Sequence, residues 1–353
     1  MQTTINEQKL QELLGKAIVD FGATMHAPLV LIGDKLGLYQ AMGNGEPVTS
    51  KELAARTNTN ERYVREWLNA QSASGYIVYD AVTHRYRMTP EQAMMLANPD
   101  SPVFLIGAFQ TALAAVKIQP TLENAFRTGE GISYHQHDHA LFHGMERFFR
   151  AGYVANLTTQ WIPALEGVEE KLHRGIDVAD VACGHGASTI LMAQAYPKSR
   201  FFGFDYHEAS IAAARERAKA AGVADRTRFE VTSAKSYPGT YDFVATFDAL
   251  HDMGDPQGAA AHALQSLRND GTWMIVEPFA NDRVEDNLNP VGRAYYSGST
   301  MICTPCAMAQ EVGVALGAQA GETRLRNIIT GGGFSRFRKA AETPFNLVLE
   351  ARP

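Results

Sequence analysis

The chain has 353 residues, of which 45% are hydrophobic and 20% are charged, and its formal net charge is -6. That length is sufficient for two domains with buried cores. The mild acidity gives no attraction to nucleic acid or to an anionic membrane, so we expect neither as a partner. The polar start of the chain, the three scattered cysteines and the shortness of the most apolar stretch, APLVLIG, favour a cytoplasmic protein.

Residues 1–118 have a mainly helical pattern, which begins with the amphipathic stretch KLQELLGKAIVDFG. Residues 47–89 then indicate a helix, a turn, a second helix and a β-hairpin. Ser50 is the expected N-cap of the first helix, and Asn58–Asn60 form the expected turn. The hairpin arms are YIVYD and RYRMT, on either side of AVTH. This order of elements predicts a winged helix.

The second helix of this winged helix, NERYVREWLNAQ, would be the one that reads DNA. Its charged residues are Glu61, Arg62, Arg65 and Glu66, so its charges cancel. A helix that binds DNA should present a basic face to the phosphates. We therefore expect a packing or dimerisation module rather than a DNA-binding domain.

Residues 154–353 alternate short apolar strands with helices, beginning with IDVADVA, STILMAQAY and RFFGFD. Such alternation predicts a parallel sheet with helices on both faces. The segments GGGFSRFRKA and PFNLVLEAR are expected to close the sheet as an antiparallel pair. The predicted fold is thus α/β, a doubly wound, mostly parallel seven-stranded sheet, after a mainly helical winged-helix domain. Residues 119–153, which show no clear period, are interpreted as a linker and lid.

A glycine turn follows the first strand of this sheet, in the segment DVACGHGAST. Gly184 and Gly186 would let a ligand approach the backbone closely. A dinucleotide fingerprint would need a third glycine at Thr189, which disfavours a nicotinamide-dependent oxidoreductase. Asp180 at the strand end suits an amine-bearing ligand, and Asp205, which ends the next strand, could accept hydrogen bonds from ribose hydroxyls.

Four segments carry a resemblance to a known family. VADVACGHG, GFDYHEASI, YDFVATFDALHDMGDP and GTWMIVEP resemble successive motifs of class I S-adenosylmethionine-dependent methyltransferases, over residues 145–353. The winged-helix part resembles that of small-molecule O-methyltransferases, in which it builds a homodimer. The resemblance implies S-adenosyl-L-methionine as cofactor, S-adenosyl-L-homocysteine as product, a small-molecule substrate and a homodimer.

The resemblance also implies a set of cofactor-binding residues. Asp180 would lie near the amino end of the methionine, and Asp205 would hold the ribose. Tyr206 would pack beside the adenine, and Ala234 and Lys235 would reach its edge. Phe247 would face the sulfonium region. The full expected set is Asp180, Ala182, Gly184, Gly186, Asp205, Tyr206, Ala234, Lys235, Phe247 and Asp248.

A histidine at the exit of the fourth strand is the candidate general base. His251 resembles the histidine that serves as base in small-molecule O-methyltransferases, with Met253 in place of the family's tryptophan. A neutral imidazole can take the proton of a hydroxyl as it attacks, and a carboxylate can orient the ring. Glu277, at the end of the fifth strand, matches the acidic position beside that base. We therefore predict His251 and Glu277 as catalytic residues and oxygen as the favoured acceptor.

Several alternatives stay open at this point. The acceptor atom could be nitrogen or carbon, or the protein could be a cofactor-binding winged-helix transcriptional regulator without turnover. Tyr153, Arg147, Asn287 and Tyr296 are the candidate substrate residues. His135, His139 and His143 would share one helix face and could chelate a metal, and Cys303 and Cys306 have redox-motif spacing. For both groups we favour the plainer interpretation, a solvated lid and a loop shaped by Pro305, and predict no metal.

Overall fold

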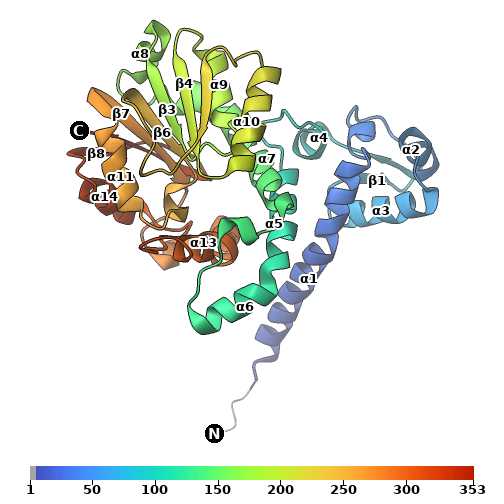
Figure 1. Ribbon diagram of the computed structural model, residues 1–353. Helices are drawn as coiled ribbons and strands as arrows, with labels where there is room; N and C mark the ends of the chain where they lie inside the picture. Colours follow the sequence, from blue (N-terminus) through green and yellow to red (C-terminus); the bar gives the residue numbers. More distant parts are fainter. Residues whose placement is uncertain (1–4) are drawn as a thin grey trace. The chain divides into compact units, whose positions relative to one another are not determined.

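The computed structural model describes residues 5–353 (Figure 1). The chain divides into two compact units. The first contains the residues up to Leu113 together with His143–Ala151, and the second contains Ala114–Phe142 and Gly152–Pro353. The expected linker and lid is mostly helical: it contains α6 (Gln119–Thr128) and most of α7 (His139–Asn156), and its residues are shared between the two units.

The first unit contains the predicted winged helix. Helices α2 and α3 are followed by a short antiparallel hairpin in which Val78 pairs with Arg87. Thr49, rather than Ser50, is the N-cap of α2, where it forms a capping box with Glu52. Asn58 ends that helix with a φ of 51°, a left-handed conformation that asparagine tolerates. The elements are α2 (Ser50–Thr57), α3 (Glu61–Ala73), β1 (Val78–Asp80) and β2 (Arg85–Arg87).

Charged side chains on α3 pair with one another along the helix. Arg65 contacts Glu61 at 2.6 Å and Arg62 contacts Glu66 at 2.5 Å, both at i,i+4 spacing. These arginines are therefore engaged with carboxylates of their own helix. This agrees with the cancellation of charge expected from the sequence.

The remaining helices of the first unit surround a core that contains Tyr39, Trp67 and Leu68. The longest helix, α1, passes the test of length and apolar composition for a membrane span, and 11% of its most apolar window is buried. The sequence expectation considered only APLVLIG, which lies inside this helix, and therefore underestimated the length of the apolar segment. These helices are α1 (Glu7–Lys35), η1 (Gln40–Met42), α4 (Pro90–Leu96) and α5 (Ile106–Ala115), the last of which ends in the second unit.

The second unit contains a seven-stranded sheet in the order β5-β4-β3-β6-β7-β9-β8. The first five strands in this order pair in parallel, and β9 pairs antiparallel with both β7 and β8, as predicted. Because β3 and β6 are neighbours, the strand order reverses between them, which is where open α/β sheets bind ligands. The strands are β3 (Asp177–Val181), β4 (Arg200–Asp205), β5 (Thr227–Val231), β6 (Tyr241–Phe247), β7 (Leu267–Pro278), β8 (Arg336–Glu342) and β9 (Asn346–Arg352).

Helices cover the sheet on both sides, with α10 on one side and α11 and α14 on the other (Figure 1). The α-helices of this unit after α7 are α8 (Val168–Arg174), α9 (Ala187–Ala195), α10 (Glu208–Ala220), α11 (Pro256–Gln265), α12 (Pro290–Gly298), α13 (Thr304–Met308) and α14 (Glu322–Gly331). The shorter helical turns are η2 (Val116–Ile118), η3 (Tyr134–Gln136), η4 (Leu157–Trp161), η5 (Leu250–Asp252), η6 (Val284–Asn287) and η7 (Ser299–Cys303).

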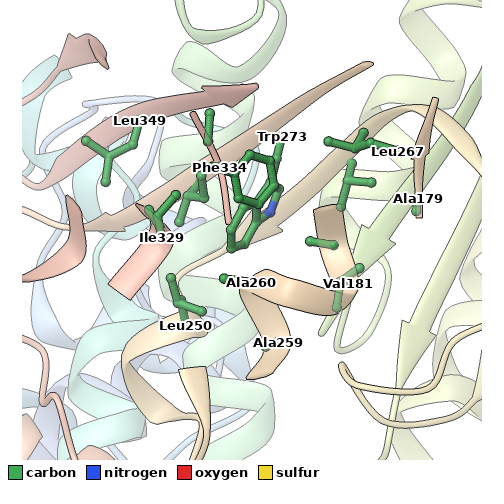
Figure 2. Close-up of a cluster of buried hydrophobic side chains, with 14 of the residues drawn as sticks. Ala179, Val181, Leu250, Ala259, Ala260, Leu267, Trp273, Ile329, Phe334 and Leu349 are labelled. Carbon is green, nitrogen blue, oxygen red and sulfur yellow. The ribbon is translucent and has the colours of Figure 1, made fainter. Parts of the chain in front are cut away.

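One hydrophobic cluster joins the sheet to α11 and α14 (Figure 2). Trp273 of β7 lies at its centre, 1% exposed, with its ring centroid 5.2 Å from that of Phe334. Its indole N–H donates to the Thr246 hydroxyl at 3.1 Å, so the buried polar atom is satisfied. Leu250 belongs to the same cluster, which fixes the backbone immediately before His251.

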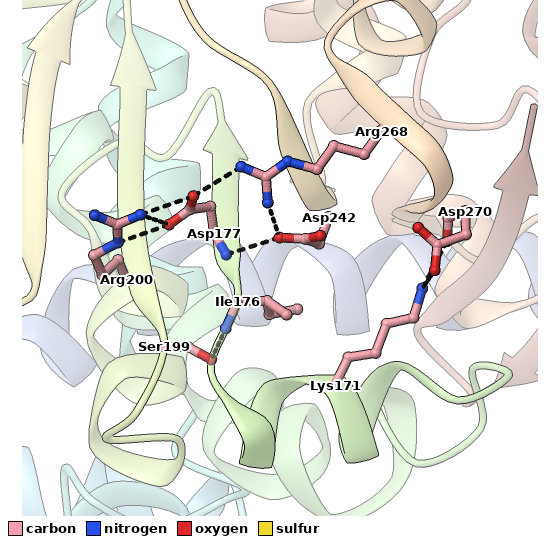
Figure 3. A network of polar contacts seen from close by, with 8 residues as sticks. All are labelled: Lys171, Ile176, Asp177, Ser199, Arg200, Asp242, Arg268 and Asp270. Atoms are coloured by element: carbon pink, nitrogen blue, oxygen red, sulfur yellow. Dashed lines mark hydrogen bonds and ion pairs between the residues drawn. The ribbon is translucent and has the colours of Figure 1, made fainter.

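Ion pairs hold the amino-terminal ends of the strands (Figure 3). Arg268 of β7 contacts both Asp177 of β3 and Asp242 of β6, and Arg200 of β4 contacts Asp177 at 2.7 Å. These charges tie together four adjacent strands at the edge opposite their carboxyl ends. The carboxyl ends are therefore left for the functional groups.

Candidate active site

The turn after β3 has three residues in the left-handed region of backbone conformation. The φ values are 62° at Ala182, 51° at Gly184 and 77° at Gly186. A Cβ at Gly184 would meet no atom within 4 Å, whereas one at Gly186 would lie 3.0 Å from Ala214 and Phe229. Gly186 is thus required by packing, and Gly184 leaves open space beside the backbone. That space is suited to a ligand.

Asp180, near the end of β3, is almost completely buried. Its Oδ2 accepts hydrogen bonds from the hydroxyls of Ser188 and Thr189, each at 2.6 Å. Its Oδ1 is buried and has no hydrogen-bond partner among the described residues. Burial raises the pKa of this carboxyl to about 6, against the effect of the two hydroxyls. An unpaired carboxylate oxygen beside the glycine turn fits the amino group of a ligand.

Asp205, at the end of β4, is bound to the backbone on both sides. Its Oδ2 accepts from the N–H of Gly184 at 2.9 Å and its Oδ1 from the N–H of His207 at 2.8 Å. The same carboxylate therefore shapes the glycine turn and begins the next helix. Tyr206 follows with 46% of its surface exposed, and its ring centroid lies 5.5 Å from that of His135. An exposed aromatic ring there is available for stacking.

The exit of β6 turns sharply at Asp248, whose φ is 48°. Its carboxylate accepts from the Tyr153 hydroxyl at 3.0 Å and from Nδ2 of Asn346 at 2.9 Å. Burial, together with the charge of Glu277, raises the pKa of Asp248 to about 8. The ring of Phe247 lies 5.3 Å from that of Tyr153 between centroids. Tyr153 and Phe247 are thus part of one buried group at this strand end.

Glu277 of β7 holds the next turn through both of its carboxylate oxygens. Oε1 accepts from the backbone N–H of Leu250 at 2.9 Å, and Oε2 lies 2.6 Å from Nδ1 of His251. His251 and Glu277 are 3% and 1% exposed. The strand β7 therefore determines where the imidazole sits and which nitrogen remains for chemistry, because Nδ1 is committed to the carboxylate.

The second ring nitrogen of His251 also has an acidic neighbour. Nε2 lies 3.2 Å from Oδ1 of Asp252. Burial opposes protonation of the ring, but the charges of Asp252 and Glu277 outweigh it and hold the pKa of His251 well above its usual range. The two carboxylates therefore favour the protonated form of the ring. The sequence reasoning assumed an unperturbed imidazole, and the structure corrects that assumption.

Three expected site residues have their side chains engaged elsewhere. Lys235 makes ion pairs with Asp255 at 3.0 Å and with Glu311 at 2.9 Å. Arg147 belongs to the first unit, where it pairs with Asp34 at 2.9 Å. Asn287 is buried in its own loop, and its Nδ2 donates to the carbonyls of Asn281 and Arg283. The expected roles at the adenine edge and in the substrate pocket gain no support from these contacts.

Two further expected residues have less specific surroundings. Ala234 packs against the hydrophobic cluster beneath the sheet's carboxyl edge. Tyr296 is half-buried on α12, and its carbonyl accepts from the Thr300 hydroxyl. Their proposed contacts with adenine and with substrate stay predictions.

Sequence reasoning did not assign to this site four residues that the structure brings to this edge. Ser188 and Thr189 bind Asp180, and Asn346 binds Asp248. Cys303 lies beside His251 and Asp252. The two hydroxyl residues directly follow the glycine turn, so their position was a usable signal. Asn346 and Cys303 come from distant segments, and only the register of β9 and the path of η7 place them.

The two secondary motifs also differ from expectation. His135 lies in η3, outside helix α7, so the three histidines do not share one continuous helix face. Pro305 is in the first turn of α13 rather than in a loop, a position that tolerates proline because that N–H needs no partner. Both cysteines of CTPC are buried, and both are free thiols.

Comparison with known proteins agrees with this arrangement. Residues 24–98 match the family model of the Rv2258c-like winged HTH domain, and residues 172–331 match that of a methyltransferase domain. An uncharacterized protein of Synechococcus is 34% identical over 101 residues, which are 28% of this chain and 24% of that protein. The match thus spans only about a quarter of that relative.

Solved structures with the same two-part architecture align over nearly the whole chain. Human N-acetylserotonin methyltransferase, solved with S-adenosylmethionine, aligns with a TM-score of 0.72 at 15% identity, over 100% of this chain and 99% of that one. The mitomycin 7-O-methyltransferase aligns with a TM-score of 0.68 at 18% identity, over 98% and 100%. A Nostoc punctiforme protein described provisionally as an O-methyltransferase gives a TM-score of 0.73 at 19% identity, over 99% of both chains.

The chain therefore contains a methyltransferase domain, preceded by a winged helix-turn-helix domain. Its fold is the one found in the O-methyltransferases with which it aligns.

Proposed function

We propose that the protein transfers a methyl group from S-adenosyl-L-methionine to a small-molecule acceptor, most readily to a hydroxyl oxygen. The cofactor supplies an electrophilic methyl group on a sulfonium. The contact between His251 Nδ1 and Glu277 Oε2, at 2.6 Å and buried at the carboxyl edge of the sheet, carries this proposal. A hydroxyl must lose its proton when it attacks, and an oriented imidazole can accept it.

The cofactor would be held by residues whose geometry already fits it. The unpaired Oδ1 of Asp180 suits the amino group, and the open space at Gly184 admits the ligand beside the backbone. The carboxylate of Asp205 would accept from the ribose hydroxyls in place of one of its backbone donors. The exposed ring of Tyr206 would cover the adenine.

The proton of the acceptor would pass to Nε2 of His251. Glu277 keeps the ring oriented through Nδ1 and stabilises the positive charge that forms. The neutral form of the ring is the one that can take up a proton, and it becomes more abundant as the pH rises. Because the carboxylates raise the pKa of the ring, this change occurs at a higher pH than for a free histidine. Nitrogen acceptors that are already neutral would depend less on this base.

The first experiment tests cofactor and chemistry separately. Calorimetry should show that S-adenosyl-L-homocysteine binds one site per chain and that NADH does not bind. Phenols and other hydroxylated compounds are then screened with S-adenosyl-L-methionine, using His251→Ala as the matched variant. Binding with no loss of turnover in His251→Ala would remove the base from the proposal, and failure to bind the cofactor would remove the function itself.

A homodimer built through the first unit is also proposed. On α1, Leu14, Ile18, Phe21 and Met25 recur at intervals of four and three residues, and each is more than half exposed. Such a stripe is typical of a helix that packs against a second helix. A second copy of this chain is the occupant that a stripe of this spacing fits.

The three free, buried thiols suit the reducing compartment that we propose, the cytoplasm.

Light scattering should give twice the chain mass for the parent and a single chain mass for Ile18→Asp. Lys16→Ala, on the same helix and in an exposed ion pair with Asp20, is the control and should stay dimeric. Because α1 also has the length of a membrane span, a second experiment tests whether the protein floats with liposomes. Flotation of the parent in place of dimerisation would contradict the assembly.

A further inference from the structure

Three different metal-binding side chains meet next to the proposed base. A ring nitrogen of His251, a carboxylate oxygen of Asp252 and Sγ of Cys303 all lie within 4.8 Å of one another. Because Nδ1 is held by Glu277, Nε2, which lies 3.2 Å from Asp252, is the nitrogen open to a cation. His251 is 3% exposed and Cys303 8% exposed, so two of the three ligand residues are buried. Imidazole, carboxylate and thiolate are the groups that bind Zn²⁺ in proteins.

The backbone that carries these side chains is held in place. The amide of Gln310 donates to the carbonyl of Asp252 at 2.8 Å and to the carbonyl of Cys306 at 3.1 Å, and accepts from the N–H of Gly254 at 3.0 Å. One side chain thus ties the segment of His251 to that of the cysteines. Because the two segments cannot drift apart without breaking these bonds, the three ligand atoms stay close.

The surroundings of the cluster also resemble those of a metal centre. Glu277 holds Nδ1 of His251 at 2.6 Å, and a carboxylate on the far nitrogen is the usual partner of a metal-bound histidine. Oδ1 of Asp252 is buried, and its contact with Nε2 of His251 at 3.2 Å is an ion pair without a hydrogen bond among the described residues. A second thiol, that of Cys306, lies three residues from Cys303 and 3.6 Å from Nε2 of His137. Cys303 of the CTPC motif thereby gains a role that the fold alone does not give it.

We infer that His251, Asp252 and Cys303 form a site for Zn²⁺ or a similar thiophilic divalent cation, and that its occupation stops methyl transfer. Binding forms bonds from the cation to nitrogen, oxygen and sulfur, and releases the imidazolium and thiol protons to solvent. Since the cation takes the lone pair of Nε2, that nitrogen can no longer accept a proton from a hydroxyl. The inhibitory part rests on the proposed function, whereas the site itself does not.

Cobalt(II) is the probe for the site, because thiolate-bound tetrahedral Co²⁺ absorbs strongly in the near ultraviolet. Full-length protein is stripped with EDTA and titrated with Co²⁺, then with Zn²⁺. One equivalent of Co²⁺ should bind with a thiolate charge-transfer band, and Zn²⁺ should displace it. Absence of that band at one equivalent would overturn the inference.

Variants assign the ligands. Cys303→Ser should lose the charge-transfer band and weaken binding by at least about 10- to 100-fold. Cys183→Ser, which removes the other buried thiol outside the motif, should keep the band. Far-ultraviolet circular dichroism and the binding of S-adenosyl-L-homocysteine check that each variant is folded. A band that survives in Cys303→Ser would assign the cation to another place and overturn the site.

Inhibition is measured as the ratio of rates with and without Zn²⁺ for each variant. The parent should be inhibited in competition with the acceptor, and Cys303→Ser should need at least about tenfold more Zn²⁺. Equal sensitivity of the two would contradict the inhibitory role. A different result is that the protein binds Co²⁺ as described and yet, when freed of metal by EDTA, methylates none of the acceptors screened. That result would contradict the proposed function but not the metal site.

Discussion

Glu277 and His251 are joined at 2.6 Å although 26 residues separate them, because β6 and β7 are parallel neighbours that end at the same edge. Removing the charge of Glu277 takes away the carboxylate that stabilises the positive charge on the ring. We expect Glu277→Gln to lower kcat by about 10²–10⁴-fold, with the affinity for the cofactor product unchanged. Steady-state kinetics measure the effect, and Glu342→Gln, an exposed acid at the end of β8, is the control. A kcat within twofold of the parent would show that the pair is only structural.

The pH dependence of methyl transfer follows from the same charges. Despite burial, Asp252 and Glu277 hold the pKa of His251 well above 6.5, so a rise in pH favours the neutral base. The rate should therefore rise with pH, through an apparent pKa above the ordinary value. Asp252→Asn removes the stronger of the two charges, so its profile should shift to lower pH. A profile that is flat between pH 6 and 9 in both proteins would speak against a titrating base.

Asp205 offers a test of the cofactor site that does not involve the base. Its carboxylate makes two backbone hydrogen bonds and is 9% exposed. Asp205→Asn should weaken the binding of S-adenosyl-L-homocysteine by about 1–3 kcal/mol, because one oxygen that can accept from ribose is lost. Calorimetry measures this, and Asp225→Asn, in an exposed ion pair with Arg226, should bind like the parent. If Asp205→Asn bound S-adenosyl-L-homocysteine as tightly as the parent, Asp205 would not be the residue that holds the ribose.

Much of the fold follows from local pattern. The strands β3 and β6, and β7 from Gly271 onward, are almost wholly buried because both of their faces are covered, and their mainly apolar runs are visible in the sequence. The glycine turn and the two strand-end acids were predictable for the same reason: their positions depend only on where a strand stops. The hairpin β1–β2 was likewise set by its turn residues.

The contacts that depend on distant segments could not be predicted. Asn346 reaches Asp248 only because β9 runs antiparallel to β7, and no local pattern gives that register. The ion pairs of Lys235 with Asp255 and Glu311 likewise join segments that are distant in the sequence, and the expected role of that lysine at the adenine edge stays a prediction. The raised pKa of His251 needs both carboxylates, against the effect of burial, and from the sequence only Glu277 was placed beside the base.

Ala182 holds a backbone conformation that is unfavourable for any residue with a Cβ. Its φ is 62°, at a position where the resemblance to methyltransferases leads one to expect glycine. Ala182→Gly should therefore stabilise the protein by about 1 kcal/mol. Urea unfolding measures the change, and Ala212→Gly, exposed in the middle of α10, should have the opposite sign with a similar size. Destabilisation by Ala182→Gly would mean that the methyl group contributes packing that outweighs the strain.

The raised pKa of Asp248 makes the free energy of unfolding depend on pH. Its pKa rises from 3.8 to about 8 on folding, chiefly through burial, so the folded protein binds this proton more tightly than the unfolded chain. Between those values the free energy of unfolding must fall as the pH rises, and above about 8 the loss is complete. His251, whose pKa is also raised, contributes stability that is lost in the same direction.

Asp248→Asn removes the carboxyl part of this dependence while keeping a polar side chain opposite Tyr153 and Asn346. From pH 5.5 to 8.5 the parent should lose on the order of 3 kcal/mol more than the variant. Urea unfolding of both proteins at the two pH values gives the difference directly. The matched control is Asp270→Asn, since Asp270 lies at the surface in an ion pair with Lys171. Parallel curves for the parent and Asp248→Asn would mean that the carboxyl of Asp248 stays ionised in the folded state, because its two donors then compensate for its burial.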